Sequence, residues 1–126
     1  MYEINVRESS RELTKRDRAM LINISGVEAL DNVVPDEGAI TIKPIDYVVI
    51  DVHNDKSKGD NKDYCNYLIY TDDGVYRTGS NSFWEAFKSI WDIFTDENGT
   101  EPFELSVYKS PSRNYNGKYF LSCSLK

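Results

Sequence analysis

One amphipathic helix set between strand-like segments constrains the fold of this chain more than any other feature. Between residues 83 and 94, apolar side chains recur at the 3.6-residue spacing of one helix face. They are Phe83, Phe87, Ile90, Trp91 and Phe94. A largely aromatic stripe of this kind is typical of a helix packed into a core, and Trp84 at its border is expected to be half exposed. The chain must therefore build a fold around one buried helix.

The segments on both sides of this helix have the patterns of β-strands. Alternating or β-branched apolar residues predict strands at 39–42, 45–53, 64–71, 75–78, 103–108 and 119–125. Asp73-Gly74 predicts a tight two-residue turn, because glycine adopts a positive φ at little cost. The connections 54–63 and 109–118 are polar and are predicted to be surface loops.

The first 38 residues have a weaker pattern. We interpret residues 1–18 as a frayed or partly extended start, in which Ser9, Ser10 and Glu12 suggest a helix entry. A short strand is expected at 20–25, a helical turn at 27–30 and a turn-rich linker at 33–38. Residues 1–38 are therefore expected to form an N-terminal extension, with 39–126 as the main domain.

Three strands, a helix and two strands is the element order of the OB-fold. This fold is a mainly β, five-stranded Greek-key barrel, and we expect the helix between its third and fourth strands to plug one end. An α+β sandwich and an SH3-like barrel are the alternatives. The sandwich would lack barrel closure, and SH3-like barrels seldom contain so long a helix. The extension would then cover a sheet edge.

The residue types present exclude several kinds of chemistry. A length of 126 residues fits one domain. The single histidine, His53, has no metal-binding partner at a recognised spacing, and Cys65 and Cys123 lie in apolar runs, as buried free thiols do. We therefore expect no enzyme, no metal and no cofactor. The chain has no apolar run near 18 residues and no secretory signal at its start, so we expect a cytoplasmic protein without membrane contact.

Charge is distributed unevenly along the chain. The net charge is −6, but residues 19–102 carry sixteen acidic and six basic side chains, whereas residues 103–126 carry one acidic and four basic. OB-folds bind oligonucleotides or oligosaccharides on the face of their second and third strands, between two flanking loops. Both predicted loops carry cations, and the second also carries a tyrosine. These residues are Lys56, Lys58 and Lys62, and Lys109, Arg113, Tyr115 and Lys118.

The predicted strands supply aromatic side chains for the same site. With Asp73-Gly74 as the turn, Tyr70 lies opposite Arg77, and both share with Asn66 the more polar face of the hairpin. By alternation, Tyr108 and Phe120 point away from the apolar face of the last hairpin, either to stack on a ligand or to pack under the extension. Aromatic rings beside cations bind single-stranded nucleic acid with little sequence preference.

The chain also resembles a known family, the small single-stranded DNA-binding proteins of tailed phages and mobile elements of Gram-positive bacteria. The resemblance covers roughly residues 40–126 and is carried by YLIYTDDGVYRTGSNSFWEAFKSIWDIF and PFELSVYKSPSRNYNGKYFLSCSLK. It implies a non-enzymatic coat of replication or recombination intermediates in a bacterial host cell, with replication proteins as further partners. By position, it places five residues near the DNA: Tyr70, Arg77, Tyr108, Lys109 and Phe120. Bacterial-type relatives end in an acidic tail, whereas this sequence ends in a strand pattern and Lys126.

Three other functions remain open at this point. The acidic middle of the chain could mimic DNA against a basic partner, for example as a phage-encoded inhibitor of a host enzyme. RNA or an oligosaccharide could replace DNA as the ligand. An enzyme is the third, although the sequence shows no nucleophile–base pair. A homo-oligomer is compatible with each of these functions.

Overall fold

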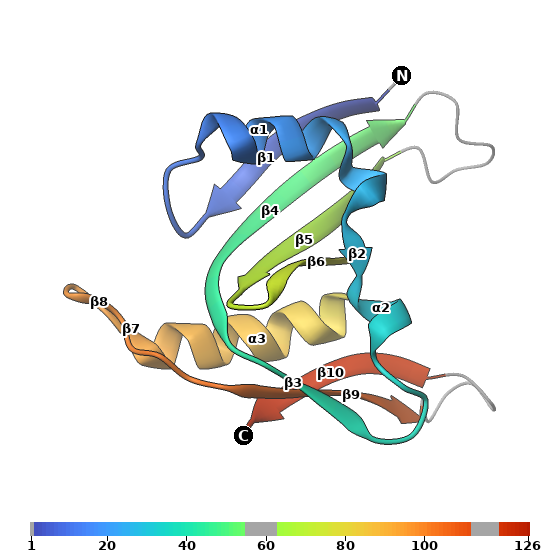
Figure 1. Cartoon of the computed structure of the whole chain (residues 1–126), viewed down its shortest axis with the longest axis vertical. Coiled ribbons are helices and arrows are strands. Elements are labelled where there is room, and N and C mark those ends of the chain that lie inside the picture. Colours follow the sequence, from blue (N-terminus) through green and yellow to red (C-terminus); the bar gives the residue numbers. More distant parts are fainter. Residues whose placement is uncertain (1, 55–62, 112–118) are drawn as a thin grey trace.

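The computed structural model describes residues 2–54, 63–111 and 119–126, and it is mainly β (Figure 1). The strands are β1 (Tyr2–Ser9), β2 (Glu28–Ala29), β3 (Ala39–Ile42), β4 (Pro44–Asn54), β5 (Asp63–Thr71), β6 (Gly74–Thr78), β7 (Thr95–Asp96), β8 (Gly99–Thr100), β9 (Leu105–Pro111) and β10 (Tyr119–Leu125). The helices are α1 (Lys15–Ile22), α2 (Leu30–Val33) and α3 (Asn81–Phe94), with a 3-10 turn η1 (Ile24–Gly26) after α1.

Two sheets enclose α3, and one bent strand joins them. The five-stranded sheet has the order β1-β4-β5-β6-β2, and the three-stranded sheet has the order β10-β9-β3. Strands β3 and β4 follow one another around Lys43, so the chain passes directly from one sheet into the other (Figure 1). A small β7–β8 hairpin follows α3. The predicted helix and the strands on both sides of it are confirmed, with boundaries shifted by a few residues.

The aromatic face of α3 forms the centre of the larger core. Phe83, Phe87 and Trp91 are buried between the two sheets, and Trp84 is half buried, as predicted. The ring of Tyr47 on β4 meets Trp84 and Trp91 edge-on, with centroids 5.1 and 5.3 Å apart. A second, smaller apolar cluster lies on the other face of the five-stranded sheet, beneath α1 and η1.

The two sheets do not close into a barrel, which corrects one part of the fold prediction. Closure would require β6 to pair with β10, but in the described part of the chain β6 pairs in parallel with β2. The start of α3 lies against β10 instead. Ser82 Oγ donates a hydrogen bond of 2.7 Å to the backbone carbonyl of Leu121, and Ser80 Oγ reaches the same carbonyl at 3.3 Å. The serine side chains at the start of α3 thus occupy a backbone carbonyl of β10. That carbonyl would otherwise be available to pair with another strand.

The N-terminal residues are more ordered than the sequence indicated. Residues 2–9 form a strand, and the helix begins after Thr14, not at Ser9 or Ser10. Thr14 and Asp17 form a reciprocal capping box at the start of the helix. Ser10 instead contacts β4, because its hydroxyl accepts a 2.8 Å hydrogen bond from the Tyr47 amide. The strand expected at 20–25 is wrong, because these residues continue α1 and then form η1. The helical turn expected at 27–30 is instead β2 followed by the start of α2.

The turn between β5 and β6 also differs from the prediction. Thr71 pairs with Gly74, so the two turn residues are Asp72 and Asp73, and Tyr70 lies opposite Val75 and not Arg77. Thr71 Oγ1 fixes this register, since it accepts hydrogen bonds from the amides of Asp73 and Gly74. The register differs from the predicted one by two residues. Because strand faces alternate with a period of two, every side chain still lies on the predicted face.

Packing of α3 should dominate stability. Phe87→Ala removes a fully buried ring from the larger core and should lower the free energy of unfolding by about 3–5 kcal/mol. Ile93→Ala, on the exposed face of the same helix, should change it by less than about 0.5 kcal/mol. Urea unfolding followed by circular dichroism measures both. Equal small losses in the two variants would contradict this placement of the core.

Candidate nucleic-acid interface

The face of the hairpin predicted to bind DNA is covered by the N-terminal segment. Tyr70 is only 9% exposed and belongs to the smaller apolar cluster, together with Leu21 of α1 and Ile24 of η1. In Figure 1, α1 and the chain leading to β2 lie along this side of the five-stranded sheet. In this structure, a base therefore has no access to the Tyr70 ring.

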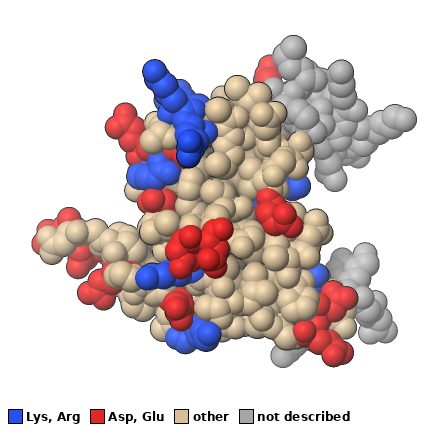
Figure 2. Space-filling model, viewed as in Figure 1, with Lys and Arg blue, Asp and Glu red and all other residues tan. Residues whose placement is uncertain are grey.

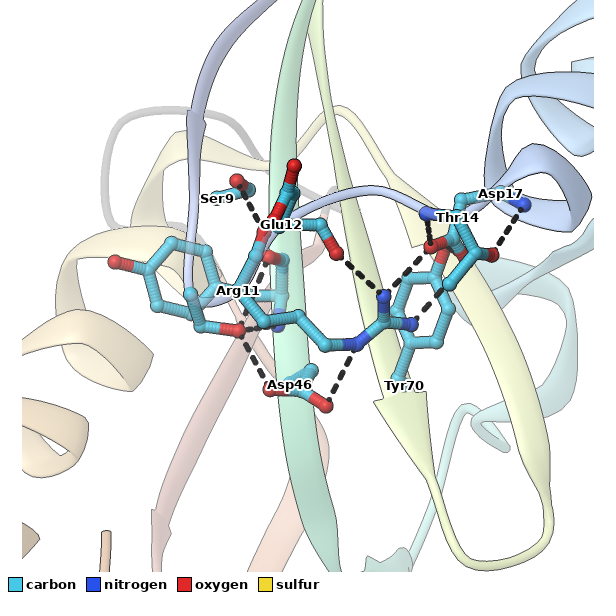
Figure 3. Close-up of polar contacts among 9 residues, drawn as sticks. Ser9, Arg11, Glu12, Thr14, Asp17, Asp46 and Tyr70 are labelled. Atoms are coloured by element: carbon cyan, nitrogen blue, oxygen red, sulfur yellow. Dashed lines mark hydrogen bonds and ion pairs between the residues drawn. The ribbon is translucent and has the colours of Figure 1, made fainter. Parts of the chain in front are cut away.

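A network around Arg11 holds this cover in place (Figure 3). The Arg11 guanidinium forms ion pairs with Asp17 of α1 at 2.6 Å and with Asp46 of β4 at 3.0 Å. It also lies 5.0 Å from the centre of the Tyr70 ring, a cation–π distance. The Tyr70 hydroxyl donates a 2.9 Å hydrogen bond to Asp17. Arg11 thus links β4, β5 and the first turn of α1 through charged and aromatic contacts.

The pKa values of Asp17 and Tyr70 are shifted in opposite directions within this network. Hydrogen bonds from Arg11 hold the pKa of Asp17 well below its usual range, although burial acts the other way. Burial, followed by the hydrogen bond to the Asp17 carboxylate, raises the pKa of Tyr70 above its usual value. Asp17 is thus ionised and Tyr70 neutral at physiological pH. That is the combination in which the hydroxyl donates to the carboxylate.

Arg77 is likewise engaged within the protein. Its Nε donates a 2.8 Å hydrogen bond to the backbone carbonyl of Val27, just before β2. Arg77 lies opposite Leu68 on β5. The predicted pair of Tyr70 and Arg77 therefore does not form a stacking surface, because both side chains fasten the N-terminal segment to the sheet.

Tyr108 and Phe120, in contrast, share an open face. They lie on neighbouring strands of the three-stranded sheet, where Phe120 pairs with Ser110 and Tyr108 with Ser122. The two residues are therefore diagonal neighbours on one face, a relation in which backbone positions are about 7–8 Å apart. Phe120 is 42% exposed and Tyr108 is half buried, and neither belongs to the two apolar clusters of the described residues. The pair thus lies outside the apolar cluster that α1 and η1 cover.

Small hydroxyl residues surround this aromatic pair, and we call the surface the Tyr108/Phe120 face. By strand alternation and pairing, the same face carries Ser106, Ser110, Ser122, Ser124 and Thr41. The hydroxyl of Thr41 accepts a 2.9 Å hydrogen bond from Lys126 Nζ, which brings one ammonium group to this face. The face therefore combines exposed π surfaces with hydrogen-bonding hydroxyls, both of which suit the bases and backbone of a single strand.

The structure brings together only part of the predicted cation set. Lys109 lies opposite Leu121, on the other face from Tyr108, and its Nζ is 3.3 Å from Asp36 Oδ1. The remaining predicted residues lie outside the described part of the chain. They are Lys56, Lys58, Lys62, Arg113, Tyr115 and Lys118.

A second basic surface was missed by the sequence analysis. Helix α1 exposes Lys15, Arg16 and Arg18, and Figure 2 shows Lys and Arg atoms gathered over this helix. The available signal was KRDR directly after Thr14, a strong helix start. It was overlooked because acidic residues elsewhere in 1–18 nearly cancel the charge of this segment in a simple count.

The Arg11 network should make the free energy of unfolding depend on pH in the acidic range. Asp17→Asn removes the carboxylate that faces Arg11 and should cost about 3 kcal/mol of unfolding free energy at neutral pH. Because the pKa of Asp17 is lower in the folded state than the unfolded value of about 3.9, its contribution is present above that value and is lost as pH falls through the folded pKa. Urea unfolding from pH 7 to pH 2 should therefore show the two proteins converging.

Asp92→Asn provides a matched control for this experiment. Asp92 pairs with Lys88 on the exposed side of α3, at an i,i+4 spacing, so its loss should cost no more than about 0.5 kcal/mol. A constant gap between the wild-type and Asp17→Asn proteins at every pH would contradict the assigned role of Asp17.

Comparison with known proteins yields no relative from which a role could be transferred: no protein-family model, curated protein or solved structure matches this chain. Among residues 2–54, 63–111 and 119–126, no three His, Cys, Asp or Glu side chains are grouped to hold a metal ion. In the same residues, no helix has the length and apolar character needed to cross a membrane. The argument about function therefore depends on the surfaces described above.

Proposed function

We propose that this protein binds single-stranded DNA without sequence preference and coats replication or recombination intermediates of a phage or mobile element. The observation that carries the proposal is the Tyr108/Phe120 face, where an exposed ring, Phe120, and a half-buried ring, Tyr108, lie on adjacent strands. Stacking of one base on an aromatic ring is worth about 1–3 kcal/mol and does not depend on which base it is. Two such rings supply part of a micromolar affinity, which corresponds to about 8 kcal/mol.

The order of strand pairing supports an OB-fold origin for this architecture. Strands β10, β9, β3/β4, β5 and β6 are neighbours in that order, and α3 separates β6 from β9 in the chain. We interpret this order as an OB-fold opened between its third and fifth strands. The usual OB ligand face, on β5 and β6, is the one covered by α1 and η1. The proposed DNA path therefore moves to the Tyr108/Phe120 face.

Loss of one ring should weaken DNA binding measurably. Phe120→Ala and Tyr108→Ala should each reduce the affinity for a labelled oligo-dT of about 30 nucleotides by roughly 5- to 150-fold. Fluorescence anisotropy at low salt measures the affinity, and duplex DNA should bind much more weakly.

Tyr119→Ala is the matched control for these variants. Tyr119 is an exposed aromatic residue on the same strand, but alternation places it on the opposite face, so its loss should leave affinity unchanged. No binding of oligo-dT to the wild-type protein at low salt would overturn the proposed function. Equal effects of Tyr119→Ala and Phe120→Ala would overturn the placement of the site.

Phosphate contacts should be visible in the salt dependence. If Arg113 contacts a phosphate, Arg113→Ala should reduce the slope of log affinity against log salt by about 0.7, the value for one contact to a single strand. Lys109→Ala should leave the slope unchanged, because the Lys109 ammonium pairs with Asp36 and lies on the other face. A titration of oligo-dT binding between low and physiological salt distinguishes the two variants. An unchanged slope for Arg113→Ala would remove that residue from the DNA path.

A second candidate function is supported by the β7–β8 hairpin. This hairpin extends away from the two sheets beyond α3, its residues are exposed, and acidic atoms line it in Figure 2. The acidic residues there are Asp96, Glu97 and Glu101. Such a projection suits a protein-interaction module that presents negative charge to a basic partner, as a DNA mimic would.

Column binding separates the second candidate from the first. Under the second candidate, the protein would pass through a single-stranded DNA column and be retained on immobilised polyarginine. Neutralising the three acidic residues as amides would weaken that retention. Retention of the wild-type protein by the DNA column would instead favour the first candidate.

A further inference from the structure

Strand β1 forms an unpaired edge of the five-stranded sheet. It lies at one end of the order β1-β4-β5-β6-β2 and pairs only with β4 among the described residues. It spans Tyr2–Ser9 and contains neither lysine nor proline, two of the residues that commonly protect an exposed edge. A bulge between Val6 and Glu8 is the one irregularity in its pairing with β4. The stretch before the bulge is therefore a regular template for another strand.

An apolar groove runs beside this edge. It has a volume of about 840 Å³ and lies between β1 and α1. Its apolar walls are Ile4, Val6, Leu13, Leu21 and Ile22. Ile22 is 81% exposed and Val6 is 42% exposed, so two large aliphatic side chains face solvent next to an open strand edge. A strand added to β1 would place every second side chain over this groove.

The sequence of β1 is complementary to itself when two copies run antiparallel. If Asn5 lies opposite Asn5 of the other copy, Ile4 lies opposite Val6, and Glu3 lies opposite Arg7. The aliphatic pairs fall on the side of the groove, because Ile4 and Val6 pair with Val52 and Ile50, which belong to the smaller apolar cluster. The charged pairs fall on the other side. Two-fold symmetry makes each of these contacts twice.

Arg7 is positioned for such an intermolecular pair. Its Nε and Nη2 hydrogen-bond to the two carboxylate oxygens of Asp51, which orients the guanidinium, and its side chain remains 59% exposed. The guanidinium carries five N–H donors, so further donors remain to meet a carboxylate from outside. Glu3 of a second copy would supply that carboxylate.

From these observations we propose that the β1 edge and the adjacent groove form a homodimer interface, in which β1 of a second copy of this chain pairs antiparallel about Asn5. The five-stranded sheet then continues across the two-fold axis. Ile22 and Val6 of each copy cover the apolar surface of the other. Neither the Tyr108/Phe120 face nor the β7–β8 hairpin takes part in this interface, so the proposal does not depend on either candidate function.

Sedimentation velocity of the full chain over a range of concentrations tests this proposal. The wild-type protein should dimerise reversibly. Ile22→Glu should weaken the dimer at least tenfold, because it introduces a charge into the apolar contact, and Glu3→Arg should do so by facing Arg7 of the other copy. Both substitutions lie at exposed positions, so circular dichroism should show unchanged folding. Glu97→Arg, on the β7–β8 turn, is a matched charge-reversal control and should leave the dimer intact.

Disulfide trapping tests the register directly. In a Cys65→Ser background, Asn5→Cys should form a covalent dimer on mild oxidation, because the two introduced thiols would meet at the symmetry axis. Glu28→Cys, on β2 at the other end of the sheet, should not. A wild-type protein that stays monomeric at every concentration would overturn the proposal. A dimer that tolerates both Ile22→Glu and Glu3→Arg, or that crosslinks equally well through Glu28→Cys, would also overturn it.

Discussion

Packing of the aromatic face of α3 between two sheets is the constraint on which the rest of this structure depends. Phe83, Phe87 and Trp91 fill the space between the sheets, so the helix itself completes the core that a closed barrel would complete with strand pairing. The start of the helix also lies against β10, through the hydrogen bonds from Ser80 and Ser82 to Leu121. Strand β6 is thereby left to pair with β2, which ties the N-terminal segment into the fold.

The N-terminal segment decides which surfaces are open to ligands. It adds a strand at each edge of the β4-β5-β6 sheet and buries the outer face of that sheet under α1 and η1. A charged network helps to hold the segment against the sheet, because Arg11 connects two carboxylates and one aromatic ring from three different elements. Once this face is closed, Tyr70 is buried, whereas Phe120 of the second sheet remains exposed. The candidate interface therefore lies on a different sheet from the one expected for an OB-fold.

Predictions from local pattern succeeded where one period dominated. The 3.6-residue stripe of α3 and the two-residue alternation of β9 and β10 identified both the elements and the sides on which their side chains lie. Even the misplaced turn at Asp72-Asp73 left the faces of Tyr70 and Arg77 correct, because the register differed by two. The prediction that the Tyr70 ring is open to a ligand was nevertheless wrong. Which face of a strand is solvated depends on what packs over it, and the Asp17 carboxylate that binds the Tyr70 hydroxyl lies 53 positions earlier in the chain.

The sequence by itself thus determined a mainly β domain with one buried helix, the boundaries of the six strands predicted after residue 38 to within a few residues, and the outward direction of Tyr108 and Phe120. These properties follow from short-range periodicity, which burial on one side imposes on each element separately. Only the tertiary structure decided that the barrel stays open, that Tyr70 and Arg77 fasten the N-terminal segment, and that β1 presents a free edge beside an apolar groove. Each of these depends on contacts between segments far apart in the chain. No local pattern specifies which of several apolar faces such segments will cover.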